Sequence, residues 1–200
     1  MKSFKKHVFN IQQQYKAFRM CINNLEENEA VVHIDFSKNY NCKLSVEVQS
    51  HHFSGSRNQV RLHAVSENLR HDAAAICIHL KPIFQELLVQ VPQLETVLIL
   101  SDGPSTQYKN KKLFYLLGTF VTKEIGAPRC VWHFSETSHG KGAPDGVGGD
   151  LKHTADNIIA QGHIIGQDEF VSLLKSSCPG IKVIGIDKDA DAQMKKLMTF

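Results

Sequence analysis

The chain has 200 residues, of which 42% are hydrophobic and 22% are charged, and its 23 basic and 20 acidic residues give a net charge of +3. These values are typical of a globular protein with a sizeable core, and they permit but do not require nucleic-acid binding. No apolar run is long enough to span a membrane, and the N-terminus lacks the apolar stretch of a secretory signal. The five cysteines are scattered and form no CxxC pair, which argues against a zinc ribbon or a disulfide framework. We therefore expect a nuclear or cytoplasmic protein without a membrane partner.

An amphipathic helix is predicted in the N-terminal segment, residues 1–29, ahead of a single domain at residues 30–200. Its apolar residues are spaced alternately by four and by three positions: Phe4, Val8, Ile11, Tyr15, Phe18, Ile22 and Leu25. Such a stripe either packs on the domain that follows or mediates a homodimer through a coiled coil.

The rest of the chain predicts a mixed sheet flanked by helices. Residues 30–36 predict a central strand, and residues 44–53 and 59–65 alternate between apolar and polar side chains, as the two strands of a hairpin do. Beyond them helices and strands alternate, which is typical of an α/β architecture. The expected helices are 68–91, kinked or divided at Pro82, then 109–125, 144–161 and 168–174, and the expected strands are 94–100, 130–135 and 181–186.

Three of the predicted strands end in carboxylates. Asp35, Asp102 and Glu136 stand at the ends of apolar runs. An unpaired charge is costly inside a buried strand, but at the carboxyl end it reaches the crevice where open α/β sheets bind ligands. Neighbouring carboxylates repel one another, and Mg²⁺ or Mn²⁺ would relieve that repulsion. Two metals at such a site suit phosphoryl transfer. The alternative is that these residues are ordinary turn acids.

A glycine-rich loop at residues 135–149 leads into a predicted helix. The N–H groups at a helix N-terminus favour phosphate, and His139 and Lys141 are candidate phosphate contacts. Asp145 falls in the first turn of that helix, where an acid is favourable. The loop lacks the GxxxxGK[ST] pattern of nucleotide-binding loops, and the alternative is an ordinary loop with a helix cap. Lys109 is a further candidate, because basic and aromatic residues follow Asp102 and could line a phosphate backbone.

Four segments resemble a group of animal proteins that look like derivatives of DDE-type transposases. They are 33–40 (HIDFSKNY), 66–72 (SENLRHD), 101–110 (SDGPSTQYKN) and 139–146 (HGKGAPDG). The resemblance implies a ribonuclease H-like α/β fold, in which a three-strand antiparallel meander precedes parallel strands that alternate with helices. It also implies metal-dependent cleavage or strand transfer of DNA phosphodiesters.

The resemblance makes Asp35 and Asp102 the first two metal ligands of a catalytic triad. The third is Asp145 or Glu136, at intervals of 145 − 102 = 43 and 136 − 102 = 34 residues from Asp102. The shorter interval is similar to that of common DDE elements. The expected position on a helix and the surrounding motif favour Asp145.

The chain departs from this group in two ways. Only Ala64 and Val65 separate His63 from Ser66, where relatives have a longer stretch, so the third strand of the meander is expected to be lost or shortened. Only a short segment without zinc-ligand spacing precedes the first strand, so site-specific DNA binding is not implied. These departures support an alternative function, a non-catalytic module that binds nucleic acid or protein and keeps the fold.

Overall fold

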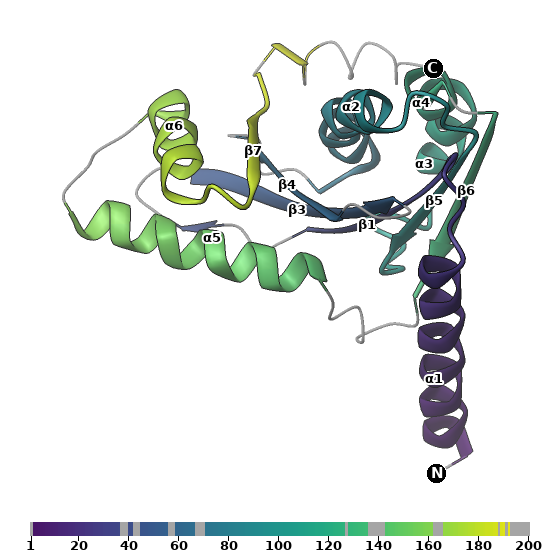
Figure 1. Ribbon diagram of the computed structural model, residues 1–200. Coiled ribbons are helices and arrows are strands. Elements are labelled where there is room, and N and C mark those ends of the chain that lie inside the picture. Colours follow the sequence, from purple (N-terminus) through teal and green to yellow (C-terminus); the bar gives the residue numbers. More distant parts are fainter. Residues whose placement is uncertain are drawn as a thin grey trace.

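A computed structural model gives the fold of the protein (Figure 1). It describes residues 2–36, 40–41, 45–55, 59–66, 71–126, 128–135, 143–161, 166–187, 189–190 and 192. The described elements are, in chain order, α1 (Lys2–Asn23), β1 (Glu29–Phe36), β2 (Tyr40–Asn41), β3 (Ser45–Gly55), β4 (Gln59–Ser66), α2 (Ala73–Gln90), β5 (Thr96–Ser101), α3 (Lys111–Leu116), the π-helical turn η1 (Leu117–Val121), α4 (Thr122–Ile125), β6 (Arg129–Phe134), α5 (Ala143–Ala160), α6 (Gln167–Ser177) and β7 (Lys182–Gly185).

The strands of the described residues form one seven-stranded sheet. Its main path runs β6-β5-β1-β3-β4-β7, and β2 pairs with β3 outside this path. The pairs β6–β5, β5–β1 and β4–β7 are parallel. The pairs β1–β3, β3–β4 and β2–β3 are antiparallel.

This arrangement corrects the fold class predicted from the sequence. The prediction was a ribonuclease H-like sheet with a three-strand antiparallel meander followed by parallel strands. Instead, a further short strand, β2, precedes β3, and β7 pairs in parallel with β4. The antiparallel strands therefore lie between parallel pairs on both sides. The periodicity of residues 181–186 predicted a strand, but its partner depends on how α5 and α6 carry the chain back across the sheet. The third antiparallel strand is present, because β4 pairs with β3 from Gln59 to Ser66.

One face of the sheet is covered by α2, with α3 and α4 beside it (Figure 1). Asp72 caps α2, since its Oδ1 accepts the N–H of Ala75 at 3.1 Å. Pro82 does not divide this helix, which continues to Gln90. The fully buried side chains of this layer include Ile34, Leu80, Ile83, Phe84 and Ile99. Apolar residues of α2 and of alternate strand positions therefore form the main core.

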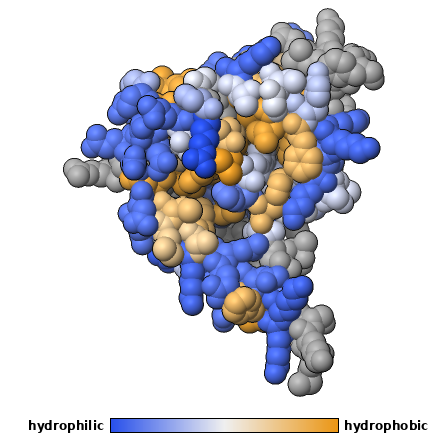
Figure 2. Space-filling view, turned by 90° about the vertical axis from the view of Figure 1, so that its right-hand side faces the viewer, coloured by the Kyte–Doolittle hydropathy of each residue, from blue (hydrophilic) through white to orange (hydrophobic). Residues whose placement is uncertain are grey.

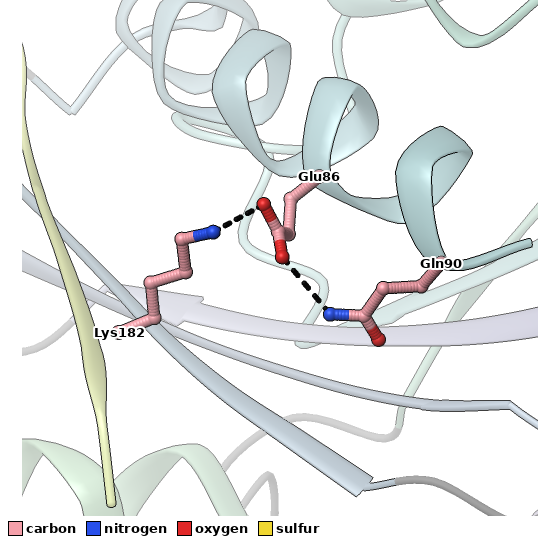
Figure 3. A network of polar contacts seen from close by, with 3 residues as sticks. All are labelled: Glu86, Gln90 and Lys182. Carbon is pink, nitrogen blue, oxygen red and sulfur yellow. Dashed lines mark hydrogen bonds and ion pairs between the residues drawn. The ribbon is translucent and has the colours of Figure 1, made fainter. Parts of the chain in front are cut away.

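The other face carries α5 and, beside β7, α6 (Figure 1). Val65 of β4 and Val183 of β7 pack there with Leu151 of α5 and Phe170 of α6. On the face of the sheet that carries α2, Lys182 of β7 forms an ion pair with Glu86 of α2 (Figure 3). Gln90 Nε2 donates to Glu86 Oε1 at 3.0 Å. The hydrogen bond from Lys182 holds the pKa of Glu86 below its usual value. These contacts tie β7 to the helical layer on the main-core face.

The predicted helix at 109–125 is not a single regular helix. α3 is followed by the π-helical turn η1, and the short α4 ends at Gly126, whose φ of 64° is left-handed. A π-turn inserts an extra residue into a helical turn and so shifts the face that follows it. The apolar periodicity alone could not locate this shift.

The purple helix α1 projects away from the sheet (Figure 1). Phe18 near its C-terminal end contacts His33 of β1, with ring centroids 5.5 Å apart. Phe4 and Tyr15 are 69% and 57% exposed. The apolar stripe of α1 is therefore only partly covered by the domain. Among the described residues, no helix is both long and apolar enough to cross a membrane.

Candidate metal centre

Asp35 and Asp102 occupy equivalent positions on neighbouring parallel strands. His33 of β1 is level with Leu100 of β5, an offset of 100 − 33 = 67 residues. The same offset separates Asp35 from Asp102, which directly follows β5. Because neighbouring strands lie about 4.8 Å apart, the two backbones are adjacent at this position. Continued by two residues beyond His33 and Leu100, this register would bring the backbones of these two predicted ligands level with each other.

Ser135, which directly follows β6, lies level with Asp102, and we refer to Asp35, Asp102 and Ser135 as the row. Ser101 of β5 is level with Phe134 of β6, so Asp102 and Ser135 follow at the same level. The Ser135 N–H donates to the Ser101 carbonyl oxygen at 2.8 Å, which continues the pairing by one residue. Sequence reasoning did not select Ser135, because only the register between β5 and β6 reveals its position.

The row lies on the face of the sheet that carries α5. Ile34 and Ile99 are buried on the α2 face. Since successive side chains of a strand alternate between faces, Asp35, Asp102 and Ser135 belong to the opposite face. α5 contacts β1 and β3 on that side, and its first turn includes Asp145. The structure thus brings α5 to the same face as Asp35 and Asp102.

Asp102 carries a buried oxygen that suits a cation. Its Oδ1 is buried and accepts no hydrogen bond from any described residue, and the same holds for the hydroxyl oxygen of Ser135. Burial raises the pKa of the Asp102 carboxyl above its usual value. A buried carboxylate oxygen without a partner is destabilising, whereas a hard divalent cation would bind it favourably. The chemistry of this oxygen therefore fits Mg²⁺ or Mn²⁺.

The other predicted ligands are not described to the same extent. Asp145 lies in α5 as expected, but its side chain is outside the described residues, as are Glu136, His139 and Lys141. Within the described part of the chain, no group of three or more His, Cys, Asp or Glu side chains is arranged to hold a metal. The described portion of the candidate centre therefore consists of Asp35 and Asp102.

Lys109 lies beside the segment that follows Asp102. The N–H groups of Tyr108 and Lys109 donate to the Pro104 carbonyl oxygen at 2.8 and 3.2 Å, so the chain turns back on itself. Lys109 Nζ is 5.2 Å from the ring centroid of Phe134. A Cβ placed on Gly103 would lie 2.7 Å from the same Nζ. The absence of a side chain at Gly103 therefore makes room for the Lys109 ammonium group.

Asn110 holds this turn and begins α3. Its Oδ1 accepts the Leu113 N–H at 3.0 Å, and its Nδ2 donates to the carbonyl oxygens of Gln107 and Ser105 at 2.9 and 3.3 Å. We expect Asn110→Ala to lower the free energy of unfolding by about 1 kcal/mol, since the helix loses its cap. Urea unfolding measures this loss. Asn110→Ser keeps a capping oxygen and, like alanine, removes the Nδ2 donor, so it serves as the control, and equal losses in the two variants would contradict a capping role.

Several solved structures resemble this chain at low sequence identity. A chain of the simian T-cell lymphotropic virus intasome in complex with PP2A regulatory subunit B56 gamma matches with a TM-score of 0.47 and 12% identity, over 76% of this chain and 48% of that chain. This chain thus spans about half the length of that one. The Mn-soaked human cytomegalovirus terminase nuclease domain matches with a TM-score of 0.35 and 10% identity, over 86% and 73%. NurA bound to dAMP and manganese gives a TM-score of 0.23 and 14% identity, over 88% and 44%.

The structural neighbours thus include nuclease domains, but TM-scores below 0.5 do not establish a shared fold or function. No curated protein matches the chain. A family model does match, at residues 14–65 and 55–199, so the two matched segments overlap in the region of β4. Together these segments cover nearly the whole sequence, and the chain belongs to the family described as Domain of unknown function (DUF8701).

Proposed function

We propose that the chain is a metal-dependent nuclease or strand transferase that acts on DNA phosphodiesters, with Asp35 and Asp102 as ligands of Mg²⁺ or Mn²⁺. The observation that carries this proposal is their equivalent position on adjacent parallel strands, together with the buried Oδ1 of Asp102 that has no partner among the described residues. When bound, such a metal stabilises charge on the phosphate and activates water at neutral pH. In the reaction, the oxygen of water or of a 3′-hydroxyl forms a bond to phosphorus as the bond to the leaving oxygen breaks.

The remaining parts of the proposed site come from the glycine-rich loop and α5. Asp145 is the third ligand we favour, since α5 begins at Ala143 and contacts β1. Glu136 is the alternative. His139, Lys141 and Lys109 would bind the phosphate, and the catalytic domain would span residues 30–200. Descent of this domain from a DDE-type transposase is a further part of the proposal, supported by the motifs alone.

The charge of α1 favours DNA over a second copy of the chain as its partner. This helix contains five basic residues and no acidic one: Lys2, Lys5, Lys6, Lys16 and Arg19. A parallel or antiparallel pair of such helices would bring like charges together, whereas a phosphate backbone would neutralise them. We therefore propose that α1 contributes to DNA binding and give less weight to a homodimer through it.

The test of this function is a Mn²⁺ titration by calorimetry. We expect saturable binding to the parent protein and none to an Asp35→Asn/Asp102→Asn variant, because the amides carry no negative charge. Glu169→Gln is the matched control, since Glu169 is an exposed acid on α6, a helix that packs against β7 at the other edge of the sheet from β6. If the folded parent binds no Mn²⁺ with or without DNA, the catalytic proposal is wrong and a non-catalytic binding module is favoured.

A further inference from the structure

An aromatic and basic surface lies on the α2 face of the sheet, at the edge strand β6. It consists of Lys109, Lys111, Phe114 and Phe134, where Lys111 precedes Phe114 by three positions on α3 and so lies on the same side of the helix, and we refer to it as the stacking surface. Figure 2, which faces the β6 side of the molecule, shows apolar residues gathered among hydrophilic ones. Phe114 on α3 is 52% exposed, and both lysines are exposed as well. A half-exposed phenylalanine beside lysines is a candidate contact for a ligand that is both flat and anionic.

The phenylalanines of this surface are held in place from below. The ring of Phe134 lies 6.3 Å from that of Phe114 in an edge-to-face contact and 6.2 Å from that of Trp132 in a stacked one. Trp132 is itself fixed, because its Nε1 donates to Ser101 Oγ at 2.9 Å. Phe114 is therefore supported by an ordered aromatic cluster, and ordering it for binding costs little conformational entropy.

The charge of the surface indicates which ligand it fits. Residues 103–123 include four lysines and no acidic residue. Lysine is depleted in protein–protein interfaces, whereas basic and aromatic side chains together are typical of surfaces that bind single-stranded nucleic acid. In such surfaces the bases stack on the aromatic rings and the cations contact the phosphates. The composition therefore favours a single strand over a protein partner.

The stacking surface lies at the same end of the sheet as the row of Asp35, Asp102 and Ser135, but on the α2 face, because Phe134 and Trp132 pack against the α2-face core. Phe134 directly precedes Ser135, and the Lys109 ammonium group lies against Gly103, which directly follows Asp102. Within the described residues β6 is an edge strand, so no further described strand covers this end of the sheet. A strand of DNA that leaves the metal centre and passes round the sheet edge at β6 would reach Lys109 and then Phe114 on the other face.

We infer that the stacking surface binds single-stranded DNA, with a base on Phe114 and phosphates at Lys109 and Lys111. The inference also implies that the substrate of the enzyme is DNA with an unpaired segment, and this part of it rests on the proposed function. The binding of single-stranded DNA to the stacking surface does not require a metal. The two are separated by measuring binding in EDTA, where no cleavage occurs.

The experiment is a titration of a fluorescein-labelled oligothymidine with the full chain in EDTA, followed by anisotropy. We expect Phe114→Ala to weaken binding about tenfold, since one stacked base is lost. Phe114→Trp keeps an aromatic ring and should bind at least as tightly as the parent. Val89→Ala is the matched control, because Val89 is 75% exposed on α2. Lys111→Gln should reduce the slope of log affinity against log salt by about 0.7, the value for one phosphate contact on a single strand.

Each outcome distinguishes the two proposals. If the parent does not bind the oligothymidine, or if Phe114→Ala binds it as tightly as the parent does, the inference is wrong, whatever the Mn²⁺ titration shows. If Phe114→Ala weakens binding while the parent binds no Mn²⁺, the surface binds single strands and the nuclease proposal fails alone. Circular dichroism of each variant establishes that it is folded, and Phe114→Trp tests the surface even if the alanine variant unfolds.

Discussion

We expect the Asp102→Asn variant to be more stable than the parent protein without metal, and to lose metal-dependent DNA cleavage by on the order of 10³-fold or more. The gain in stability follows from the buried Oδ1, which has no hydrogen-bond partner among the described residues. Neutral asparagine has a smaller desolvation penalty than the carboxylate. The loss of activity follows because metal stabilisation of a phosphate transition state is worth several kcal/mol, and about 1.4 kcal/mol corresponds to a factor of ten.

The pH dependence of the stability gain has a definite sign. Burial raises the pKa of the Asp102 carboxyl, so the folded state binds this proton more readily than the unfolded state does. The ionised carboxyl therefore destabilises the fold above its raised pKa, and this penalty disappears as the pH falls below the ordinary value for aspartate. The advantage of Asp102→Asn should be largest near neutral pH and vanish in acid.

Thermal unfolding in EDTA and in Mn²⁺, combined with cleavage of a labelled oligonucleotide, measures both effects. Mn²⁺ should raise the melting temperature of the parent and of Glu169→Gln but not that of Asp102→Asn, because a ligand stabilises only the state that binds it. A variant that is less stable than the parent in EDTA, or that still responds to Mn²⁺, would show that Asp102 has a structural role instead.

A second large effect is expected on acidification. His63 and His79 are buried, and burial lowers the pKa of each imidazole from 6.5 to about 3. For His63, the nearby His79 and Lys152 lower the pKa further, and both ring nitrogens lack a hydrogen-bond partner among the described residues. The unfolded chain takes up a proton at each site below pH 6.5, while the folded protein does not until about pH 3. The free energy of unfolding should therefore fall by about 2 kcal/mol per histidine between pH 7 and pH 5.

Urea unfolding at pH 7 and pH 5 measures this fall. In His63→Leu, which removes one of the two buried imidazoles, we expect the fall to be smaller by about 2 kcal/mol. His133→Gln is the control, because His133 on β6 is an exposed histidine outside the buried pair. If His63→Leu loses as much stability on acidification as the parent, the imidazole of His63 is already protonated in the fold and the prediction is wrong.

Local sequence patterns were sufficient to locate most of the elements. The apolar run at 94–100 was confirmed as β5, the one at 130–135 as β6, and the helical stripe at 68–91 as α2. These predictions succeed because a strand or helix that buries one or both faces has an apolar pattern of the corresponding period. The predicted hairpin of residues 44–53 and 59–65 was also confirmed, as the antiparallel pair β3–β4, but the pairing of β7 was not predicted. The fold class was wrong because the place of β7 beside β4 is set by hydrogen bonds between segments far apart in the chain.

For the candidate site too, local sequence patterns predicted some features and the tertiary structure decided the others. The sequence by itself placed Asp35 and Asp102 at the carboxyl ends of apolar runs, because a carboxylate is costly in the middle of a buried strand. Only the tertiary structure decided that the two are level, that Ser135 continues their row and that Lys109 lies over Gly103 and Phe134. Register is a property of paired backbones, and burial of the Asp102 oxygen is a property of everything packed around it. Neither is encoded in the neighbours of a residue along the chain, and so the composition of the site was predictable but its geometry was not.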